Sequence, residues 1–166
     1  MSQLQSELQG SREQLFASIR GLSEEQFRFA PAGGDGWSIA AHLAHLLRIE
    51  RIFTERARAA LVQDEPQMAS TRVHNDDDPG ASQKLAIPQI VHGMLNARRD
   101  LDAVLDACDE DGMERAIVHE RLGRMTIRQI AVKMAGHEAE HAAEIARLVR
   151  QVPPSGRVII PLTRRS

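Results

Sequence analysis

Two histidines near the C-terminal end of the sequence could bind a metal ion together. His137 and His141 are four residues apart in the segment His137-Glu138-Ala139-Glu140-His141. On an α-helix this spacing places both imidazoles on one face, one turn apart, where they can bind the same ion. The segment also matches H-E-x-x-H, the pattern of zinc proteases in which the glutamate is the general base. It therefore predicts a divalent metal site.

The residues after this segment do not support a protease. The longer protease pattern requires a glycine three residues after His141 and a histidine six residues after it, but the chain has Glu144 and Arg147 there. No histidine or acidic residue follows Glu144, so a zincin-type glutamate ligand is also missing downstream. A third ligand must therefore come from earlier in the chain.

His45 and His42 are the candidates for this third ligand. They lie about one turn apart in a predicted helix that opens at Ser38, and their spacing does not choose between them. Glu50 falls on the apolar face of the same helix, where a carboxylate needs a partner. We expect Glu50 to orient a ligand histidine, to reach the metal through water, or to pair with an arginine.

Hydrophobic periodicity predicts the helices that must position these side chains. Apolar residues recur at helical spacing in four long segments, at about 4–21, 38–62, 88–108 and 126–151. Ser38 and Thr126 are the predicted N-caps of the second and fourth segments, and Pro153-Pro154 ends the fourth. The sequence therefore predicts an all-α protein, a four-helix bundle with a long crossover loop, 63–86, between helices 2 and 3.

Shorter elements and the domain division complete this prediction. Ser23 and Gln26 form a predicted capping box that opens a short helix, and residues 116–118 form a short extended piece before a turn at Gly123. We expect one four-helix metal-binding domain at 1–152. We expect a C-terminal extended tail at 153–166, which is apolar and β-prone over residues 157–162.

Composition and charge exclude several classes of function. The chain has 166 residues, enough for one domain, and 21 basic against 23 acidic residues give a net charge of −2. This balance argues against binding to nucleic acid or to an anionic membrane. No stretch approaches the roughly 20 apolar residues of a membrane span, and the polar N-terminus differs from a signal peptide. With a single cysteine, Cys108, the chain is expected to be cytoplasmic.

Three motifs, in this order, resemble the DinB-like (YfiT-like) metalloenzyme superfamily. They are Gly36-Trp37-Ser38-Ile39-Ala40-Ala41-His42-Leu43-Ala44-His45-Leu46, Gly123-Arg124-Met125-Thr126-Ile127 and His137-Glu138-Ala139-Glu140-His141. The resemblance covers about residues 5–150. In that family a histidine eight residues after the tryptophan joins the His-x-x-x-His of the last helix, and here that residue is His45. The resemblance therefore implies a four-helix bundle with a metal on His45, His137 and His141.

The same resemblance implies a class of chemistry. Characterised relatives include thiol S-transferases that use bacillithiol, mycothiol or glutathione, a mycothiol-dependent isomerase, and metal-dependent hydrolases. We expect zinc or nickel, with cobalt, iron or manganese as alternatives. Three neutral imidazoles leave such an ion with an open position, where a bound water or thiol loses its proton near neutral pH.

Three functional hypotheses follow from this chemistry. The first is a transferase that acts with a metal-activated low-molecular-weight thiol on a small electrophile. The second is a metal-dependent hydrolase of a small amide or ester, and the third is a metal-binding or ligand-binding bundle without turnover. The resemblance and the apolar tail also imply a homodimer. We expect its substrate to be a small molecule.

The remaining candidate residues are one glutamate, four histidines and the cysteine. Glu138 is either a proton acceptor at the metal or a solvated helix position. His42 and His119 are candidates for lining the pocket. His74 is expected in an exposed loop and His92 on the surface. Cys108 is expected to be a small core residue near a helix end.

Overall fold

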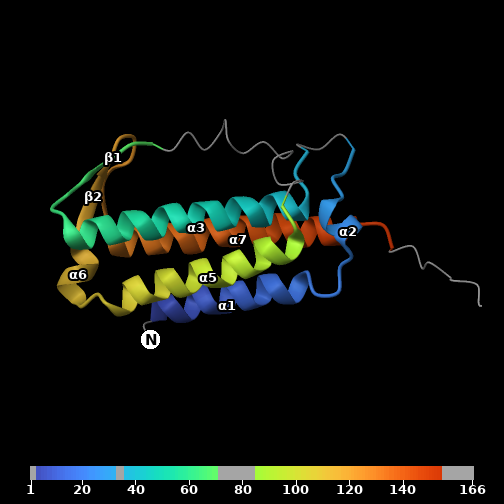
Figure 1. Cartoon of the computed structure of the whole chain (residues 1–166), viewed down its shortest axis with the longest axis horizontal. Helices are drawn as coiled ribbons and strands as arrows, with labels where there is room; N and C mark the ends of the chain where they lie inside the picture. Colours follow the sequence, from blue (N-terminus) through green and yellow to red (C-terminus); the bar gives the residue numbers. More distant parts are fainter. Residues whose placement is uncertain (1–2, 33–35, 71–84, 155–166) are drawn as a thin grey trace, which may run out of the picture.

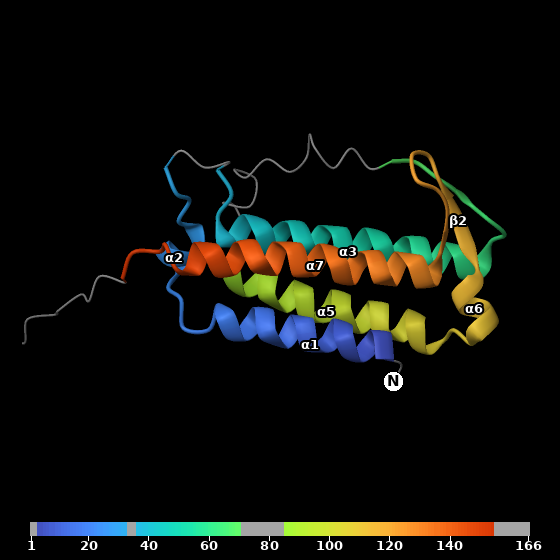
Figure 2. The same cartoon turned by 180° about the vertical axis from the view of Figure 1, so that it is seen from behind.

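Four long helices form the body of the computed structural model, which describes residues 3–32, 36–70 and 85–154 (Figure 1). They are α1 (Gln3–Ser18), α3 (Ile39–Val62), α5 (Ile87–Asp106) and α7 (Ile127–Val149). Their ends lie within three residues of the predicted ends, so the four-helix bundle is confirmed. α3 packs against both α5 and α7, and α1 packs against α7 (Figure 2). None of the helices in these ranges is long and apolar enough to cross a membrane.

The helices begin where the sequence provides caps. The Ser38 side chain accepts a hydrogen bond from the backbone N–H of Ala41 at the start of α3. Thr126 caps α7 in the same way, and Gln129 closes the capping box. Pro88 lies in the first turn of α5, where its missing N–H costs nothing. These local signals fix the ends of the two helices, α3 and α7, that carry the predicted ligands.

A second capping box opens the short helix α2 (Glu24–Arg28), as predicted. Ser23 accepts from the backbone of Gln26, whose side chain accepts from the backbone of Ser23. α2 follows the C-terminal end of α1 and packs against α3.

A small three-stranded sheet closes the end of the bundle where α3 ends and α7 begins. Its strands are β1 (Gln67–Met68), β2 (Ala116–His119) and β3 (Gly123–Thr126), in the order β1-β2-β3. β2 pairs parallel with β1 and antiparallel with β3. Gly123 enters β3 with φ +71, a conformation that glycine adopts without strain. A short helix, α6 (Glu110–Glu114), precedes the sheet.

This sheet corrects the all-α prediction. The extended piece at 116–118 is confirmed as part of β2, whereas β1, β3 and α6 were not predicted. The protein is a mostly helical four-helix bundle with a small sheet. Strands of two to four residues are too short to show an alternating pattern, and β1 pairs with a strand about fifty residues away in sequence.

Two parts of the sequence-based description lie largely outside the described residues. Most of the predicted crossover at 63–86 falls in 71–84, which also contains His74, and most of the predicted tail falls in 155–166. The domain division and the homodimer therefore stay predictions.

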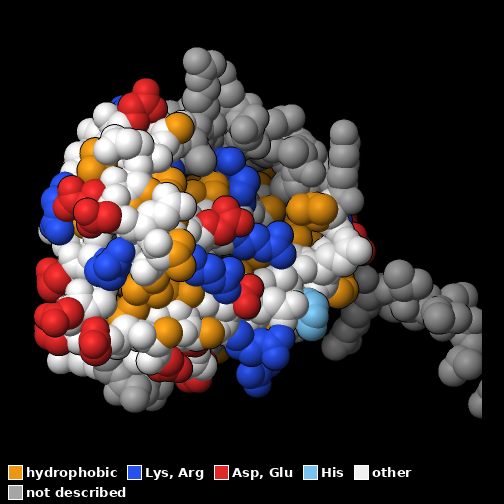
Figure 3. Space-filling model, turned by 60° about the vertical axis from the view of Figure 1, so that its left-hand side comes forward, with side chains coloured by type: hydrophobic (Ala, Val, Ile, Leu, Met, Phe, Trp, Pro, Cys, Tyr) orange, Lys and Arg blue, Asp and Glu red, His pale blue; other side chains and the backbone are white. Residues whose placement is uncertain are grey.

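At the sheet end, Figure 3 shows basic and acidic side chains distributed among apolar and neutral ones. Exposed ion pairs such as Arg128–Glu110 and Arg124–Glu65 belong to this balanced surface.

The buried apolar side chains form two clusters along the bundle. The cluster nearer the sheet takes a residue from each long helix, for example Leu8, Phe53, Leu101 and Met134. The cluster nearer α2 does the same, for example with Leu15, Leu46, Met94 and Ile145. Between them, each long helix places one charged residue on its buried face.

These four residues are Arg12 of α1, Glu50 of α3, Arg98 of α5 and Glu138 of α7, and we call them the charge quartet. None is more than 4% exposed. The Arg12 Nη2 donates to Glu50 Oε2 at 2.9 Å and to Glu138 Oε2 at 2.6 Å. Arg98 donates through Nε to Glu50 Oε1 and through Nη2 to Glu138 Oε2, both at 2.7 Å. Two guanidinium groups and two carboxylates thus cancel each other's charge inside the core.

Further hydrogen bonds attach the charge quartet to the backbone and to a hydroxyl. Arg12 Nη1 donates to the Met94 carbonyl of α5 at 3.0 Å. Arg98 Nη1 donates to the Leu8 carbonyl of α1. The Ser11 hydroxyl donates to Glu138 Oε1 at 3.0 Å. The charge quartet therefore fixes the axial position of every long helix relative to the others.

Removing one member of the charge quartet should destabilise the fold strongly. Glu50→Ala leaves Arg12 and Arg98 with excess buried positive charge, so the free energy of unfolding should fall by about 3–5 kcal/mol. Glu144→Ala is the control, because Glu144 forms an exposed pair with Arg147, and its loss should cost less than about 1 kcal/mol. Urea denaturation followed by circular dichroism measures both changes. Equal costs for the two variants would contradict the assignment.

The charge quartet should also make stability depend on acidity. Burial raises the pKa of Glu138, but hydrogen bonding and charge from Arg12, followed by the charge of Arg98, outweigh this effect and hold the pKa below its ordinary value. A carboxyl with a lowered folded-state pKa stabilises the protein above its unfolded-state pKa, about 4.3. That stabilisation is lost as the pH falls through the folded-state pKa.

The comparison that isolates this effect is with Glu138→Gln, which keeps the shape of the side chain but cannot ionise. The difference in free energy of unfolding between wild type and this variant should be large at pH 7. It should shrink below about pH 4. Urea denaturation at several pH values measures it, and a difference that grows on acidification would refute the pKa assignment.

Candidate metal centre

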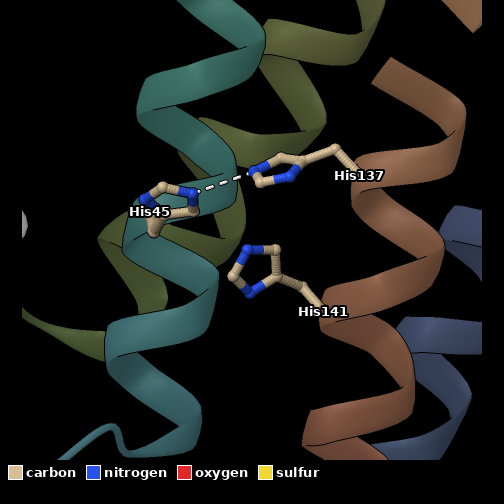
Figure 4. A group of neighbouring side chains, drawn as sticks. All are labelled: His45, His137 and His141. Atoms are coloured by element: carbon tan, nitrogen blue, oxygen red, sulfur yellow. Dashed lines mark hydrogen bonds between the residues drawn. The ribbon is translucent and has the colours of Figure 1, made fainter. Parts of the chain in front are cut away.

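The three histidines predicted as ligands converge between α3 and α7 (Figure 4). His45 extends from the second turn of α3, and His137 and His141 extend from one face of α7. One ring nitrogen from each residue lies within 4.8 Å of the other two. His45 Nε2 and His137 Nε2 lie 2.9 Å apart. The helical spacing seen in the sequence thus produces a three-nitrogen cluster.

His141 has a further contact on the side opposite this cluster. Its Nδ1 lies 2.7 Å from Nδ1 of His42, one turn before His45 on α3. Figure 4 shows one ring nitrogen of His141 directed toward the rings of His45 and His137 and the other directed away from them. Since Nδ1 contacts His42, the nitrogen that faces the cluster is Nε2.

The donor set and its dimensions fit a divalent ion. A tetrahedral ion about 2.1 Å from each imidazole nitrogen would separate the nitrogens by about 3.4 Å. The His45–His137 separation of 2.9 Å lies close to this value, and no separation in the cluster exceeds 4.8 Å, so small side-chain rotations suffice. His45 is buried, whereas His137 and His141 are half-buried, which leaves one side for a further ligand. Within the described ranges, this is the one group of three or more His, Cys, Asp or Glu residues that could hold an ion.

Trp37 covers part of the cluster with an apolar ring. Its ring centroid lies 5.0 Å from that of His42, 5.3 Å from that of His45 and 6.0 Å from that of His141. Trp37 directly precedes the cap residue Ser38, so the start of α3 fixes its place. The sequence motif contained this tryptophan, but its contact with three histidines was not predicted.

Both glutamates that were candidates for catalysis belong to the charge quartet. Of the alternatives for Glu50, the structure shows pairing with arginine. The prediction that Glu138 is either a proton acceptor at the metal or a solvated position is wrong, because its fully buried carboxylate accepts hydrogen bonds from Arg12 and Arg98. A step of one residue turns a helix by about 100°, so Glu138 faces the bundle axis while His137 faces α3.

His119 does not lie with the three histidines. It is buried in β2, which packs at the C-terminal end of α3, where Arg115 Nε donates to the Ala60 carbonyl. His45 is fifteen residues before Ala60, a distance of about 22 Å along the helix. The prediction that His119 lines the pocket is therefore wrong.

The surroundings of His119 suit a buried, neutral imidazole. Its Nδ1 accepts hydrogen bonds from the backbone N–H groups of Arg121 and Leu122 at 3.1 and 3.2 Å. Burial, followed by the positive charge of Arg56, lowers the pKa of His119, which favours the neutral ring. It is a structural residue of the β2–β3 turn.

The other histidine and cysteine predictions have simple outcomes. His92 is exposed on α5, as predicted. Cys108 follows the end of α5, is half-buried and donates from Sγ to the Val104 carbonyl. Glu140, next to the ligand pair, is exposed, and its Oε2 lies 3.9 Å from His137 Nδ1.

The two arginines of the charge quartet were missed in the sequence, although a pattern could have revealed them. Arg12 lies four residues after Leu8 and three before Leu15, which places it on the buried stripe of its helix. Arg98 stands in the same relation to apolar residues of α5. A charged residue at an apolar position of each helix is the pattern that predicts a buried network.

The chain is similar to known proteins in family and in fold. The family model described as the DinB superfamily matches residues 7–145. The solved structure of YfiT from Bacillus subtilis, described as a probable metal-dependent hydrolase with an unusual four-helix bundle topology, has a TM-score of 0.79 at 15% identity. The alignment covers 91% of this chain and 89% of that one.

A second solved structure, TT2238, is described as a four-helix bundle protein. It has a TM-score of 0.64 at 17% identity, with 87% of this chain and 96% of that one covered. No curated protein matches the sequence. At these identities the structural likeness shows the fold, and the chemistry has to be argued from the site.

Metal content should test the cluster directly. We expect about one equivalent of divalent metal in the protein purified without added metal and without a histidine tag. His45→Ala should lose this metal, because two imidazoles hold an ion weakly. His92→Ala is the matched control and should retain it. Elemental analysis measures all three, and metal retained in His45→Ala would show that another residue is the third ligand.

Proposed function

This chain belongs to the DinB superfamily, and we propose that it is a metal-dependent transferase acting with a low-molecular-weight thiol of the bacillithiol or mycothiol type on a small electrophile. The observation that carries the proposal is the cluster of three imidazoles, which in the described part of the chain includes no carboxylate. When bound, a divalent ion on three neutral imidazoles keeps its full charge and an open position, where a bound thiol or water loses its proton near neutral pH.

The chain's own residues divide the remaining tasks. His45, His137 and His141 would hold the ion between two helices that the charge quartet fixes relative to each other. Trp37 places an apolar ring beside them, which limits the access of water on that side. The half-buried side of His137 and His141 is the side from which substrates would approach.

The position of Glu138 supports a thiol over water as the nucleophile. In H-E-x-x-H hydrolases this glutamate takes the proton from water, but here it accepts hydrogen bonds from two arginines in the core. A free thiol has a pKa of about 8.5, far below the value of about 15.7 for water. A thiol therefore needs less help from a protein base.

The thiol would have to come from a second substrate. Cys108, the single cysteine of the sequence, lies beyond the far end of α5, more than a turn past the charge quartet. Burial, followed by the charge of Asp109, raises its pKa, which lowers its reactivity near neutral pH. Cys108 is a poor candidate for the nucleophile.

Hydrolysis of a small amide or ester is the second candidate. It is supported by the description of YfiT, which shares the fold, as a probable metal-dependent hydrolase. In this chain an exposed residue such as Glu140, or the substrate itself, would have to accept the proton of the attacking water.

A rate assay should separate these candidates. The metal-loaded protein should speed the conjugation of bacillithiol, mycothiol or glutathione to a chromogenic aryl halide. His141→Ala should fall to the uncatalysed rate because the ion is lost, whereas Cys108→Ser should keep the wild-type rate.

The controls decide among the alternatives. Hydrolysis of a chromogenic ester without any thiol would favour the hydrolase. If metal-loaded protein is inactive across a broad panel of thiols, electrophiles and esters, the transferase proposal fails. The chain would then be a metal-binding bundle without turnover.

A further inference from the structure

We propose that His42 is a positioning residue that fixes the ring of His141 through an Nδ1–Nδ1 hydrogen bond and is not itself a ligand. The proposal rests on the proposed metal site. It starts from one contact: the two Nδ1 atoms lie 2.7 Å apart, and His42 is only 6% exposed. Both residues are at defined places, His42 in the first turn of α3 and His141 on the ligand face of α7.

The chemistry of imidazole determines which nitrogen carries the hydrogen. To bind an ion through Nε2, His141 needs a lone pair there, so its hydrogen must be on Nδ1. That N–H then donates to the lone pair on Nδ1 of His42, whose own hydrogen is on Nε2. A single contact therefore selects the tautomers of both rings.

Ligand histidines usually donate this second N–H to a carboxylate, a backbone carbonyl or water. Here the acceptor is another neutral imidazole. It orients the ring but adds no negative charge beside the ion. A bound ion would therefore keep its full positive charge, which would favour deprotonation of a thiol or water at its open position.

The start of α3 holds His42 rigidly enough for this role. Its backbone N–H donates to the Ser38 carbonyl at 3.1 Å, within the capped first turn. The Trp37 ring lies against the His42 ring, with the planes inclined by 46°. The segment from Trp37 to His45 therefore supplies one ligand and the support of another.

The geometry argues against His42 as a ligand. The cluster of mutually close ligand atoms comprises His45, His137 and His141. The Nδ1 of His42 contacts the edge of His141 that is directed away from the other two rings (Figure 4). A lone pair that accepts the His141 N–H is not available to the ion.

Three substitutions test the role of the acceptor. His42→Asn places Oδ1 near the position of Nδ1 and can accept the same hydrogen bond. His42→Phe keeps the ring against Trp37 but has no acceptor, and His42→Ala removes both. We expect Phe and Ala to weaken zinc binding by roughly 10- to 100-fold, and Asn to restore most of the affinity.

Zinc affinity is measured by competition with a chromogenic chelator, and cobalt(II) absorption reports the ligand set. All three variants should retain the cobalt spectrum of a three-nitrogen site once saturated. Urea denaturation of the metal-free proteins separates loss of folding from loss of affinity, because a purely structural role would lower stability without distinguishing Asn from Phe at the metal.

The outcomes separate this inference from the proposed function. Wild-type affinity in His42→Phe, or equal weakening by Asn and Phe, would overturn the positioning role. Loss of a nitrogen donor from the saturated cobalt spectrum of His42→Ala would show a ligand and overturn it too. A wild-type protein that binds no metal would overturn the proposed function itself, whereas failure of thiol transfer alone would leave the role of His42 standing.

Discussion

The charge quartet is the constraint on which the alignment of the bundle, and with it the candidate metal site, depends. Taking four charges out of water is costly, and the cost is offset only where guanidinium and carboxylate groups meet. A shift of one helix by a single turn, about 5.4 Å, would leave charges buried without partners. Because Glu138 directly follows His137, and Glu50 lies five residues after His45, the alignment that pairs the charges also brings the ligands together.

Much of this arrangement could be predicted from the sequence because its signals are local. Caps at Ser38 and Thr126 define the helices that carry the ligands, and both were confirmed. The spacing of His137 and His141 depends only on helical geometry, which the cap of α7 guarantees. The choice of His45 over His42 came from the family resemblance, since both residues lie near the same face of α3.

The remaining features depend on contacts between distant segments. Arg12 and Arg98 interrupt apolar stripes, and nothing within their own helices reveals the carboxylates that they meet. The partners of Glu138 could not be predicted for the same reason. It directly follows the predicted ligand His137 in the sequence, but its carboxylate contacts Arg12 and Arg98. β1 was missed because it pairs with β2 across a long stretch of chain. The role of His42 likewise depends on the packing of α3 against α7.

The contact of Trp37 with the histidine rings has a spectroscopic consequence. The chain has one tryptophan and no tyrosine, so its near-ultraviolet emission arises essentially at this ring. The ring lies about as close to His45 and His141 as stacked aromatic side chains lie to each other. An ion bound by these imidazoles would change the environment of the indole, and an open-shell ion such as cobalt(II) would also quench its fluorescence. The fluorescence of Trp37 should therefore report whether a metal ion occupies the site.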